Sequence, residues 1–237
     1  MMPKDSIIPI ERSVIPACDV SSLKDLERIV KNTSNIEKIG GYKIGFELGL
    51  KYGFSSVVDV IGKYSDKPII YDHQKAGTDI PDIGENFARI CWVSGIDAVI
   101  LFPQSGPETE KAWIEAAFER GLGVIVGGLM THPKYLRSEG GYIADEAIME
   151  MYLNAADLGV RNFVVPGNRP NDIKKIRKAI EQKGISPTFY APGFIEQGGK
   201  LSEAAKAAGK RFHGIVGRTL CNAENIEKVA RDLTSQI

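Results

Sequence analysis

Several common sequence signals are scarce in this chain, and each scarcity narrows what the protein can be. Of its 237 residues only three are cysteines, Cys18, Cys91 and Cys221, and no two of them form a Cys-x-x-Cys pair. This spacing argues against a disulfide framework and favours reduced, buried thiols in a cytoplasmic protein. Basic and acidic residues number 30 each, so the net charge gives no support to nucleic acid or a membrane surface as a partner.

Membrane, targeting and cofactor signals are also missing. No apolar run approaches the roughly 18 residues that a membrane span needs. Met1 to Arg12 mixes charges with prolines and lacks the apolar core of a signal peptide. No Gly-x-Gly-x-x-Gly follows the first predicted strand, which argues against a dinucleotide-binding sheet. No set of histidine, cysteine and carboxylate residues has metal-ligand spacing, so we expect no metal site.

What the chain does have is a regular alternation of short apolar, β-branched runs with longer amphipathic segments. The predicted strands are Val14–Cys18, Tyr42–Phe46, Pro68–Tyr71, Ala98–Phe102, Val124–Leu129, Asn162–Val165, Thr188–Ala191 and Gly214–Val216. The predicted helices include Ser22–Asn32, Pro81–Ser94, Pro107–Arg120, Ala144–Leu158, Pro170–Lys183, Leu201–Ala208 and Asn222–Ser235. Strands that are apolar throughout are typical of a parallel sheet covered on both faces. Eight such units predict an α/β protein with a (β/α)₈ TIM barrel, as a single domain over residues 1–237.

Start and stop signals support several of these helices. Ser22 precedes a helix as an N-cap residue, Pro107 and Pro170 occupy first-turn positions, and Asn222 with Glu224 predicts the start of the last helix. Glycines follow four helices where a left-handed cap is expected; they are Gly95, Gly121, Gly159 and Gly184.

Charged residues gather at the end of the third predicted strand. Asp72, Lys75 and Asp79 follow Pro68–Tyr71, and Lys43 lies inside the strand before it. Burying an unpaired charge costs several kcal/mol or more, whereas alternating charges neutralise one another and shift each other's pKa. The pattern therefore predicts a proton-transfer site, since the chemistry of such barrels lies at the carboxyl ends of the strands.

A second signal lies in the last two units. Pro192 to Gly199 is a glycine-rich loop after the seventh strand, and Gly217-Arg218 follows the eighth. Loops at these two positions form the recurrent phosphate site of the fold, where backbone N–H groups approach the oxygens and an arginine supplies a two-pronged contact. We therefore expect a phosphate-bearing substrate, with Gly193–Lys200 as a lid. The one long irregular connection, Thr131–Tyr142, is a further candidate for function.

With these residues in place, the chain resembles orotidine 5′-phosphate decarboxylase of the archaeal type over nearly its whole length. The first half of the resemblance consists of Ala17-Cys18-Asp19-Val20, Tyr42-Lys43-Ile44-Gly45, Asp72…Lys75…Asp79-Ile80-Pro81 and Met130-Thr131-His132-Pro133. The second half consists of Leu158-Gly159-Val160, Val165-Pro166-Gly167-Asn168-Arg169-Pro170, Pro192-Gly193…Gln197-Gly198-Gly199 and Ile215-Val216-Gly217-Arg218. These motifs occur in the same order as in the family, and the ordered set is a more specific sign of resemblance than any single motif.

The resemblance implies a cofactor-independent decarboxylation of orotidine 5′-monophosphate to UMP, in pyrimidine biosynthesis. Its charged tetrad comprises Lys43, Asp72, Lys75 and Asp79. By resemblance, Asp72 lies beside the substrate carboxylate, Lys75 delivers a proton to C6, and Asp79 reaches into the partner's site of a homodimer. The substrate-binding residues that the resemblance implies are Asp19 at the ribose, Thr131 at the pyrimidine, and Pro192, Gln197, Gly198, Gly217 and Arg218 toward the phosphate.

The chain departs from the family pattern at three places. The usual spacing is Asp-x-Lys-x-x-Asp, whereas this chain has Asp-x-x-Lys-x-x-x-Asp from Asp72 to Asp79. Residues i and i+3 of a strand face opposite sides, so Asp72 and Lys75 converge only if the chain bulges or leaves the strand at His73-Gln74. Ile83 replaces a threonine that contacts the partner's ribose, and Thr131 replaces a serine.

Three alternatives stay open from the sequence. The nearest is a Mg²⁺-dependent hexulose-phosphate synthase-type lyase of the same suprafamily, whose acidic metal ligand belongs on the second strand; Glu47 is close, but at the start of the next helix. A second is a Schiff-base aldolase that uses Lys43 or Lys75. A third is a non-catalytic nucleotide-binding protein that keeps Arg218 and has lost the geometry of the tetrad.

Overall fold

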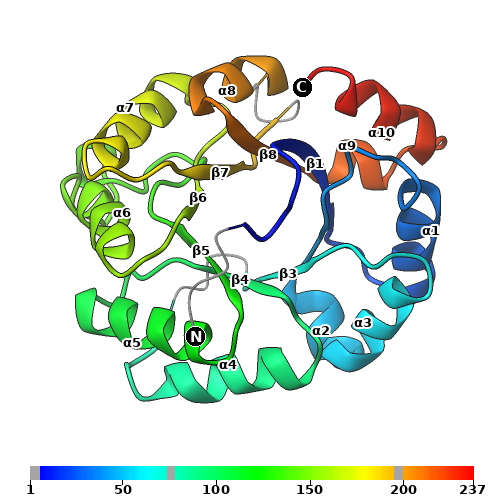
Figure 1. Ribbon diagram of the computed structural model, residues 1–237, viewed down its shortest axis with the longest axis horizontal. Helices are drawn as coiled ribbons and strands as arrows, with labels where there is room; N and C mark the ends of the chain where they lie inside the picture. Colours follow the sequence, from blue (N-terminus) through cyan, green and yellow to red (C-terminus); the bar gives the residue numbers. More distant parts are fainter. Residues whose placement is uncertain (1–5, 74–77, 195–199) are drawn as a thin grey trace.

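The computed structural model describes residues 6–73, 78–194 and 200–237, and they form a closed barrel of eight parallel strands (Figure 1). Each strand pairs with the next along the chain, and β8 pairs with β1. The strands are β1 (Arg12–Cys18), β2 (Tyr42–Ile44), β3 (Ile69–Asp72), β4 (Ala98–Leu101), β5 (Gly123–Gly127), β6 (Asn162–Val164), β7 (Thr188–Ala191) and β8 (Arg211–Val216). The predicted (β/α)₈ fold is therefore confirmed.

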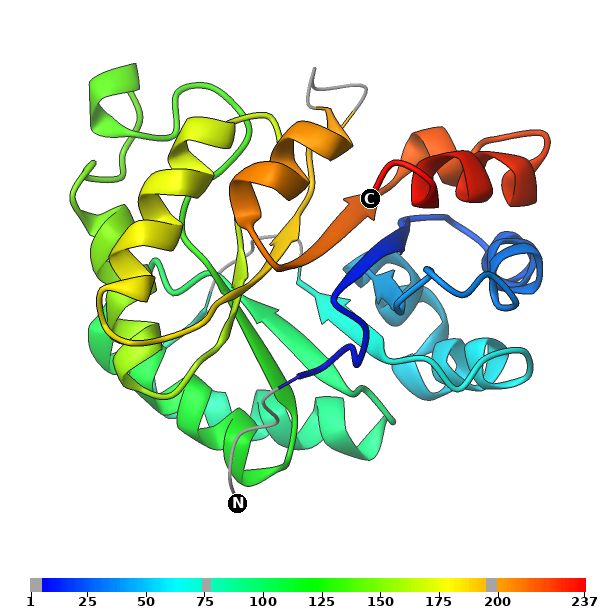
Figure 2. The same cartoon turned by 45° about the horizontal axis from the view of Figure 1, so that its top comes forward.

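Helices surround the barrel on its outer side (Figures 1 and 2). They are α1 (Leu23–Thr33), α2 (Phe46–Tyr52), α3 (Phe54–Gly62), α4 (Ile83–Val93), α5 (Pro107–Glu119), α6 (Ala147–Asp157), α7 (Pro170–Glu181), α8 (Leu201–Ala208), α9 (Arg218–Cys221) and α10 (Ile226–Thr234), with a 3₁₀ turn, η1 (Arg137–Glu139). Within the described ranges, no helix is both long enough and apolar enough to cross a membrane.

Most of the predicted helix ends are confirmed. The Ser22 hydroxyl accepts a hydrogen bond from the Asp25 N–H at 3.1 Å, and Pro107 and Pro170 open their helices. The four predicted glycine caps all have positive φ, between 72° and 98°. The prediction that Asn222 starts the last helix is wrong. Asn225 is its N-cap, accepting from the Lys228 N–H at 2.9 Å, and residues 218–221 form the separate helix α9.

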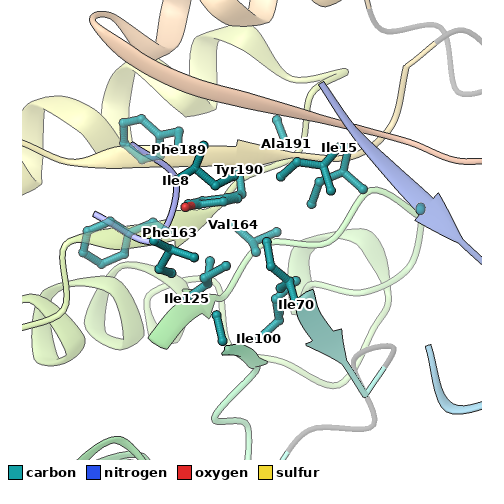
Figure 3. Close-up of a cluster of buried hydrophobic side chains, with 14 of the residues drawn as sticks. Ile8, Ile15, Ile70, Ile100, Ile125, Phe163, Val164, Phe189, Tyr190 and Ala191 are labelled. Carbon is teal, nitrogen blue, oxygen red and sulfur yellow. The ribbon is translucent and has the colours of Figure 1, made fainter. Parts of the chain in front are cut away.

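The barrel interior is filled by apolar side chains from alternate strand positions. Ile70, Ile100 and Ile125 lie in the same part of the core (Figure 3), and each is at most 4% exposed. Ile8, from the segment before β1, lies among Phe163, Phe189 and Tyr190 and is fully buried (Figure 3). The interior is thus packed from its amino-terminal end, which leaves the carboxyl ends of the strands for polar groups.

Glu110 and His213 are two of the titratable side chains buried in this scaffold. Glu110, in the first turn of α5, is 2% exposed, and its Oε1 has no hydrogen-bond partner. Burial raises the pKa of Glu110 from 4.5 to about 8, against a smaller opposing effect from a hydrogen bond with Asn154. His213 lies within β8, not before it as the sequence suggested, and its Nδ1 is 2.8 Å from the Ser13 hydroxyl. Burial, then repulsion by Arg211, lowers the pKa of His213 to about 3.

Candidate active site

The centre of the candidate site is Lys43, and the strand register explains its surroundings. Lys43 pairs with Ala17 of β1 on one side and with Ile70 of β3 on the other. Asp19 and Asp72 lie two residues beyond these partners, so both carboxylates belong one layer nearer the carboxyl end of the barrel. Two residues of a strand rise about 7 Å, a distance that a lysine side chain spans. The register therefore directs one ammonium group between two carboxylates.

The distances confirm this arrangement. Lys43 Nζ lies 3.1 Å from both carboxylate oxygens of Asp19 and 3.2 Å from Oδ2 of Asp72. Lys43 and Asp72 are each 4% exposed, whereas the side chain of Asp19 is 38% exposed. Burial acts to lower the pKa of Lys43, but the charges and hydrogen bonds of Asp72 and Asp19 together outweigh it and raise this pKa above 10.5. The lysine therefore stays protonated at neutral pH.

This charged cluster opens into a cavity of about 310 Å³ at the carboxyl end of the barrel. Asp19, Lys43 and Asp72 line one part of it. The apolar side chains in its wall come from four strands and their loops; they are Ile100, Phe102, Val164, Phe194, Ile215 and Val216. The cavity thus combines a charged centre with apolar walls, which suits a planar heterocycle that carries a carboxylate.

Another part of the cavity wall comes from the segment after β8, the strand that pairs with β1. Gly217 and Arg218 line the cavity, together with Thr219, Cys221 and Asn222. Pro192, the first residue of the predicted glycine-rich loop, also lines the cavity. A cationic side chain and a hydroxyl therefore face the same space as Lys43, on the side where the sequence predicted a phosphate.

The remaining predicted site residues are not all among the cavity residues. Lys75, Gln197 and Gly198 lie outside the residues that the structure describes. Thr131 is partly buried in the connection after β5 and is absent from the residues that line the cavity. Asp79 is exposed on the connection between β3 and α4. The roles of these five residues stay predictions.

The chain leaves the sheet directly after Asp72, which is one of the two routes that the longer spacing required. Asp72 points inward and is buried, and His73 is the first residue beyond the strand. The Nδ1 atom of His73 is hydrogen bonded to the Tyr71 hydroxyl, and its ring lies 6.4 Å from that of Phe87. His73 therefore belongs to the outer packing between β3 and α4.

Sequence reasoning missed several cavity residues and misjudged one loop. It assigned Thr219 no role and took Asn222 as the start of the last helix, because it did not recognise α9 as an element; their position after the last strand was the available signal. The connection Thr131–Tyr142 was expected to be irregular, yet it contains η1 and a bridge between Leu136 and Ile143. Arg169 lines a different hollow and pairs with Glu139 of η1 at 3.1 Å.

Comparison with known proteins shows which family this chain belongs to. The model of the Orotidine 5'-phosphate decarboxylase / HUMPS family matches residues 12–233, which include all eight strands. The chain belongs to this family. An orotidine 5'-phosphate decarboxylase from Methanosarcina barkeri is 34% identical over 227 residues, covering 94% of each chain. The enzyme of the same name from Methanosarcina mazei is 31% identical, with the same coverage.

Solved structures agree with the fold. The orotidine 5'-phosphate decarboxylase from Pyrococcus horikoshii superposes with a TM-score of 0.77 at 28% identity, covering 94% of this chain and 98% of that one. An orotidine 5'-monophosphate decarboxylase from Methanocaldococcus jannaschii, complexed with the inhibitor BMP, reaches a TM-score of 0.81 at 23% identity. The match covers 100% of this chain, and because the identity is only 23% it supports the fold alone.

Proposed function

We propose that this protein decarboxylates orotidine 5′-monophosphate to UMP, a step of pyrimidine biosynthesis, without a cofactor. The observation that carries the proposal is the buried cluster in which Lys43 contacts both Asp19 and Asp72, in the wall of a cavity that Arg218 also lines. The nearly full-length similarity to decarboxylases of this name supports it.

The reaction explains why charges are concentrated here. Loss of CO₂ from a vinylic ring carbon leaves a carbanion that no adjacent carbonyl delocalises. A preorganised cation facing that carbon stabilises the developing charge, and a protonated lysine also supplies the proton that replaces CO₂. We assign this role to Lys75, with Asp72 beside the substrate carboxylate. Lys43, which stays protonated between carboxylates, fixes Asp72 from the layer below.

The two ends of the substrate have their own groups. Asp19, partly exposed and already oriented by Lys43, accepts hydrogen bonds from the ribose hydroxyls. Arg218 and the backbone at Gly217 meet the phosphate, together with Gln197, Gly198 and Pro192, and Thr131 reads the pyrimidine. Binding energy from the phosphate, far from C6, is then available to lower the barrier at the reacting carbon.

We further propose that the active unit is a homodimer with shared sites, in which Asp79 of one subunit completes the tetrad of the other. The exposed apolar side chains support this assembly. Seven of the eight exposed large apolar residues in the described ranges lie between residues 46 and 93; they are Phe46, Leu50, Ile80, Ile83, Ile90, Trp92 and Val93. Asp79 is next to Ile80 in this region. Ile83, which stands where the family usually has a threonine, is one of these exposed apolar residues.

The Mg²⁺-dependent synthase is the weaker alternative. A metal ligand on the second strand would be needed where Lys43 stands, and the ammonium group between Asp19 and Asp72 repels a divalent cation from that place. Glu47 is exposed in the first turn of α2 and lines a neighbouring hollow, not the cavity.

The test is loss of orotidylate ultraviolet absorbance when purified protein is added in the presence of EDTA. We expect turnover under these conditions, and no turnover by Lys75→Ala although UMP still binds to that variant. Absence of turnover by the wild type, with Mg²⁺-dependent turnover of a sugar phosphate instead, would establish the synthase. Near-normal activity of Lys75→Ala would remove Lys75 from its role while leaving the reaction in place.

A further inference from the structure

The helix α9 is too short to fix its own position. It has four residues, Arg218 to Cys221, and its main-chain hydrogen bonds include Cys221 N–H to Gly217 O at 3.0 Å and Asn222 N–H to Arg218 O at 2.9 Å. Helices of this length are not stable by themselves, so contacts with other elements must determine where α9 lies. It lies beside β1 and α10 (Figure 1).

Two hollows adjoin α9. Arg218 and Thr219 face the cavity of about 310 Å³ described above. Cys221 and Asn222 also line a second hollow of about 390 Å³, whose wall includes Asp25 and Glu47. The contacts of α9 with β1, α10 and α1 therefore contribute to how Arg218 is aimed.

One anchor ties α9 to the barrel. Leu220 is fully buried, and the thiol of Cys221 donates a hydrogen bond to the Ala17 carbonyl of β1 at 3.1 Å. Burial, followed by the charge of Asp19, raises the pKa of the Cys221 thiol to about 12, so it stays protonated and remains a donor. This anchor fixes the side of α9 that faces the sheet.

The second anchor is Arg28 of α1. Its Nη2 donates to the Cys221 carbonyl at 3.0 Å and its Nη1 to the Ala223 carbonyl at 3.3 Å. Carbonyls at the end of a helix lack partners within the helix and carry the negative end of its dipole, so a planar cationic fork suits them well. Arg28 is exposed and lines the second hollow, not the cavity.

We propose that Arg28 is a positioning residue for phosphate binding, which orients α9 so that Arg218 and Thr219 face the cavity before the nucleotide arrives. The inference rests on the proposed function, because it takes a nucleotide phosphate as the group that α9 meets. If α9 is already ordered in the free protein, binding does not have to supply the entropic cost of ordering it. The gain therefore appears as higher affinity for the phosphate end of the ligand.

The test compares Arg28→Ala and Arg28→Lys with Lys24→Ala, which removes an exposed positive charge one turn earlier in the same helix. We expect Arg28→Ala to weaken UMP binding about 5- to 20-fold, the range that corresponds to loss of charge-assisted hydrogen bonds. Uridine, which has no phosphate, should bind all of the variants equally. Arg28→Lys should recover part of the loss, because its ammonium reaches one carbonyl. With orotidine 5′-monophosphate, KM should rise and kcat should stay within about twofold.

A ligand-free measurement separates this inference from the proposed function. Exchange of the Cys221 and Asn222 amide hydrogens should be faster in Arg28→Ala than in the wild type and in Lys24→Ala. Faster exchange and weaker UMP binding in a protein that does not decarboxylate would sink the proposed reaction and support the role of Arg28. Unchanged exchange and unchanged UMP affinity would overturn the role of Arg28 whatever the turnover. Equal losses for uridine and UMP would also overturn it, since they indicate general damage to the cavity.

Discussion

Glu110 offers a direct test of how burial controls a charge in this barrel. Its folded-state pKa of about 8 lies above the ordinary value of 4.5, so the folded protein binds this proton more tightly than the unfolded chain. The free energy of unfolding should therefore fall as pH rises from 4.5 to about 8, and should level off above that range. At about 1.4 kcal/mol for each pKa unit, the difference between 4.5 and about 8 corresponds to a loss of roughly 5 kcal/mol in the free energy of unfolding. Relaxation around the buried carboxylate reduces this loss to about 2–3 kcal/mol.

The substitution Glu110→Gln removes the ionisation and keeps the shape of the side chain. We expect this variant to be more stable than the wild type by about 2–3 kcal/mol at pH 9 and to differ little at pH 5, in urea unfolding followed by circular dichroism. Glu108→Gln is the matched control, because Glu108 is exposed in the same first turn of α5 and its substitution should show no such pH dependence. A difference between Glu110→Gln and wild type that is constant from pH 5 to pH 9 would refute the reasoning.

Three further predictions concern other parts of the molecule. The pKa of His213 is lowered to about 3, so the wild type should lose stability as pH falls from 6.5 toward 3, and acid titration of His213→Asn should show a shallower loss. Lys43→Met should abolish orotidylate turnover and lower the free energy of unfolding by about 2 kcal/mol, measured with urea, because two carboxylates lose a cation. Leu50, 82% exposed on α2, should be part of the dimer interface: Leu50→Lys should sediment as a monomer, whereas Tyr142→Lys, at a 92% exposed site elsewhere, should sediment as the wild type does.

The fold was predictable because its strands are buried on both faces. Runs such as Ala98–Leu101 and Thr188–Ala191 are fully buried and carry no charged residue, so their apolar pattern marks them directly. Strand ends were less predictable: β8 begins at Arg211, whose polar side chain is accommodated by Thr188 and Ser6 at the amino-terminal end of the barrel. A partnered polar residue cannot be distinguished from a loop residue in the sequence.

Helices that depend on tertiary contacts were the harder part. Near Glu47 the sequence indicated one helix start, but the structure has two helices divided at Gly53, where φ is +77°. The helix α9 carries no periodic pattern in its four residues and is fixed by Arg28, almost 200 positions away in sequence. Such a contact becomes visible only after the barrel brings its first and last units together.

The core of the site was more accessible to sequence reasoning than its edges. A lysine within an apolar strand requires partners, and the register of β1, β2 and β3 supplies Asp19 and Asp72. The base-recognition role of Thr131 could not be judged in the same way, because it lies in a connection whose path depends on η1 and on bonds such as that from the Tyr135 hydroxyl to the Gly128 carbonyl at 2.9 Å.

The layered placement of Lys43 below Asp19 and Asp72 also has a consequence for divergence. Ion pairs buried in a protein interior are commonly no more stabilising than well-packed apolar residues of similar volume. A variant of this barrel that no longer needed the reaction could therefore replace all three charges together with well-packed aliphatic side chains at little or no cost in stability. The three charges, with Lys43 3.1–3.2 Å from each carboxylate, are therefore better explained by the proposed chemistry than by a requirement of the fold.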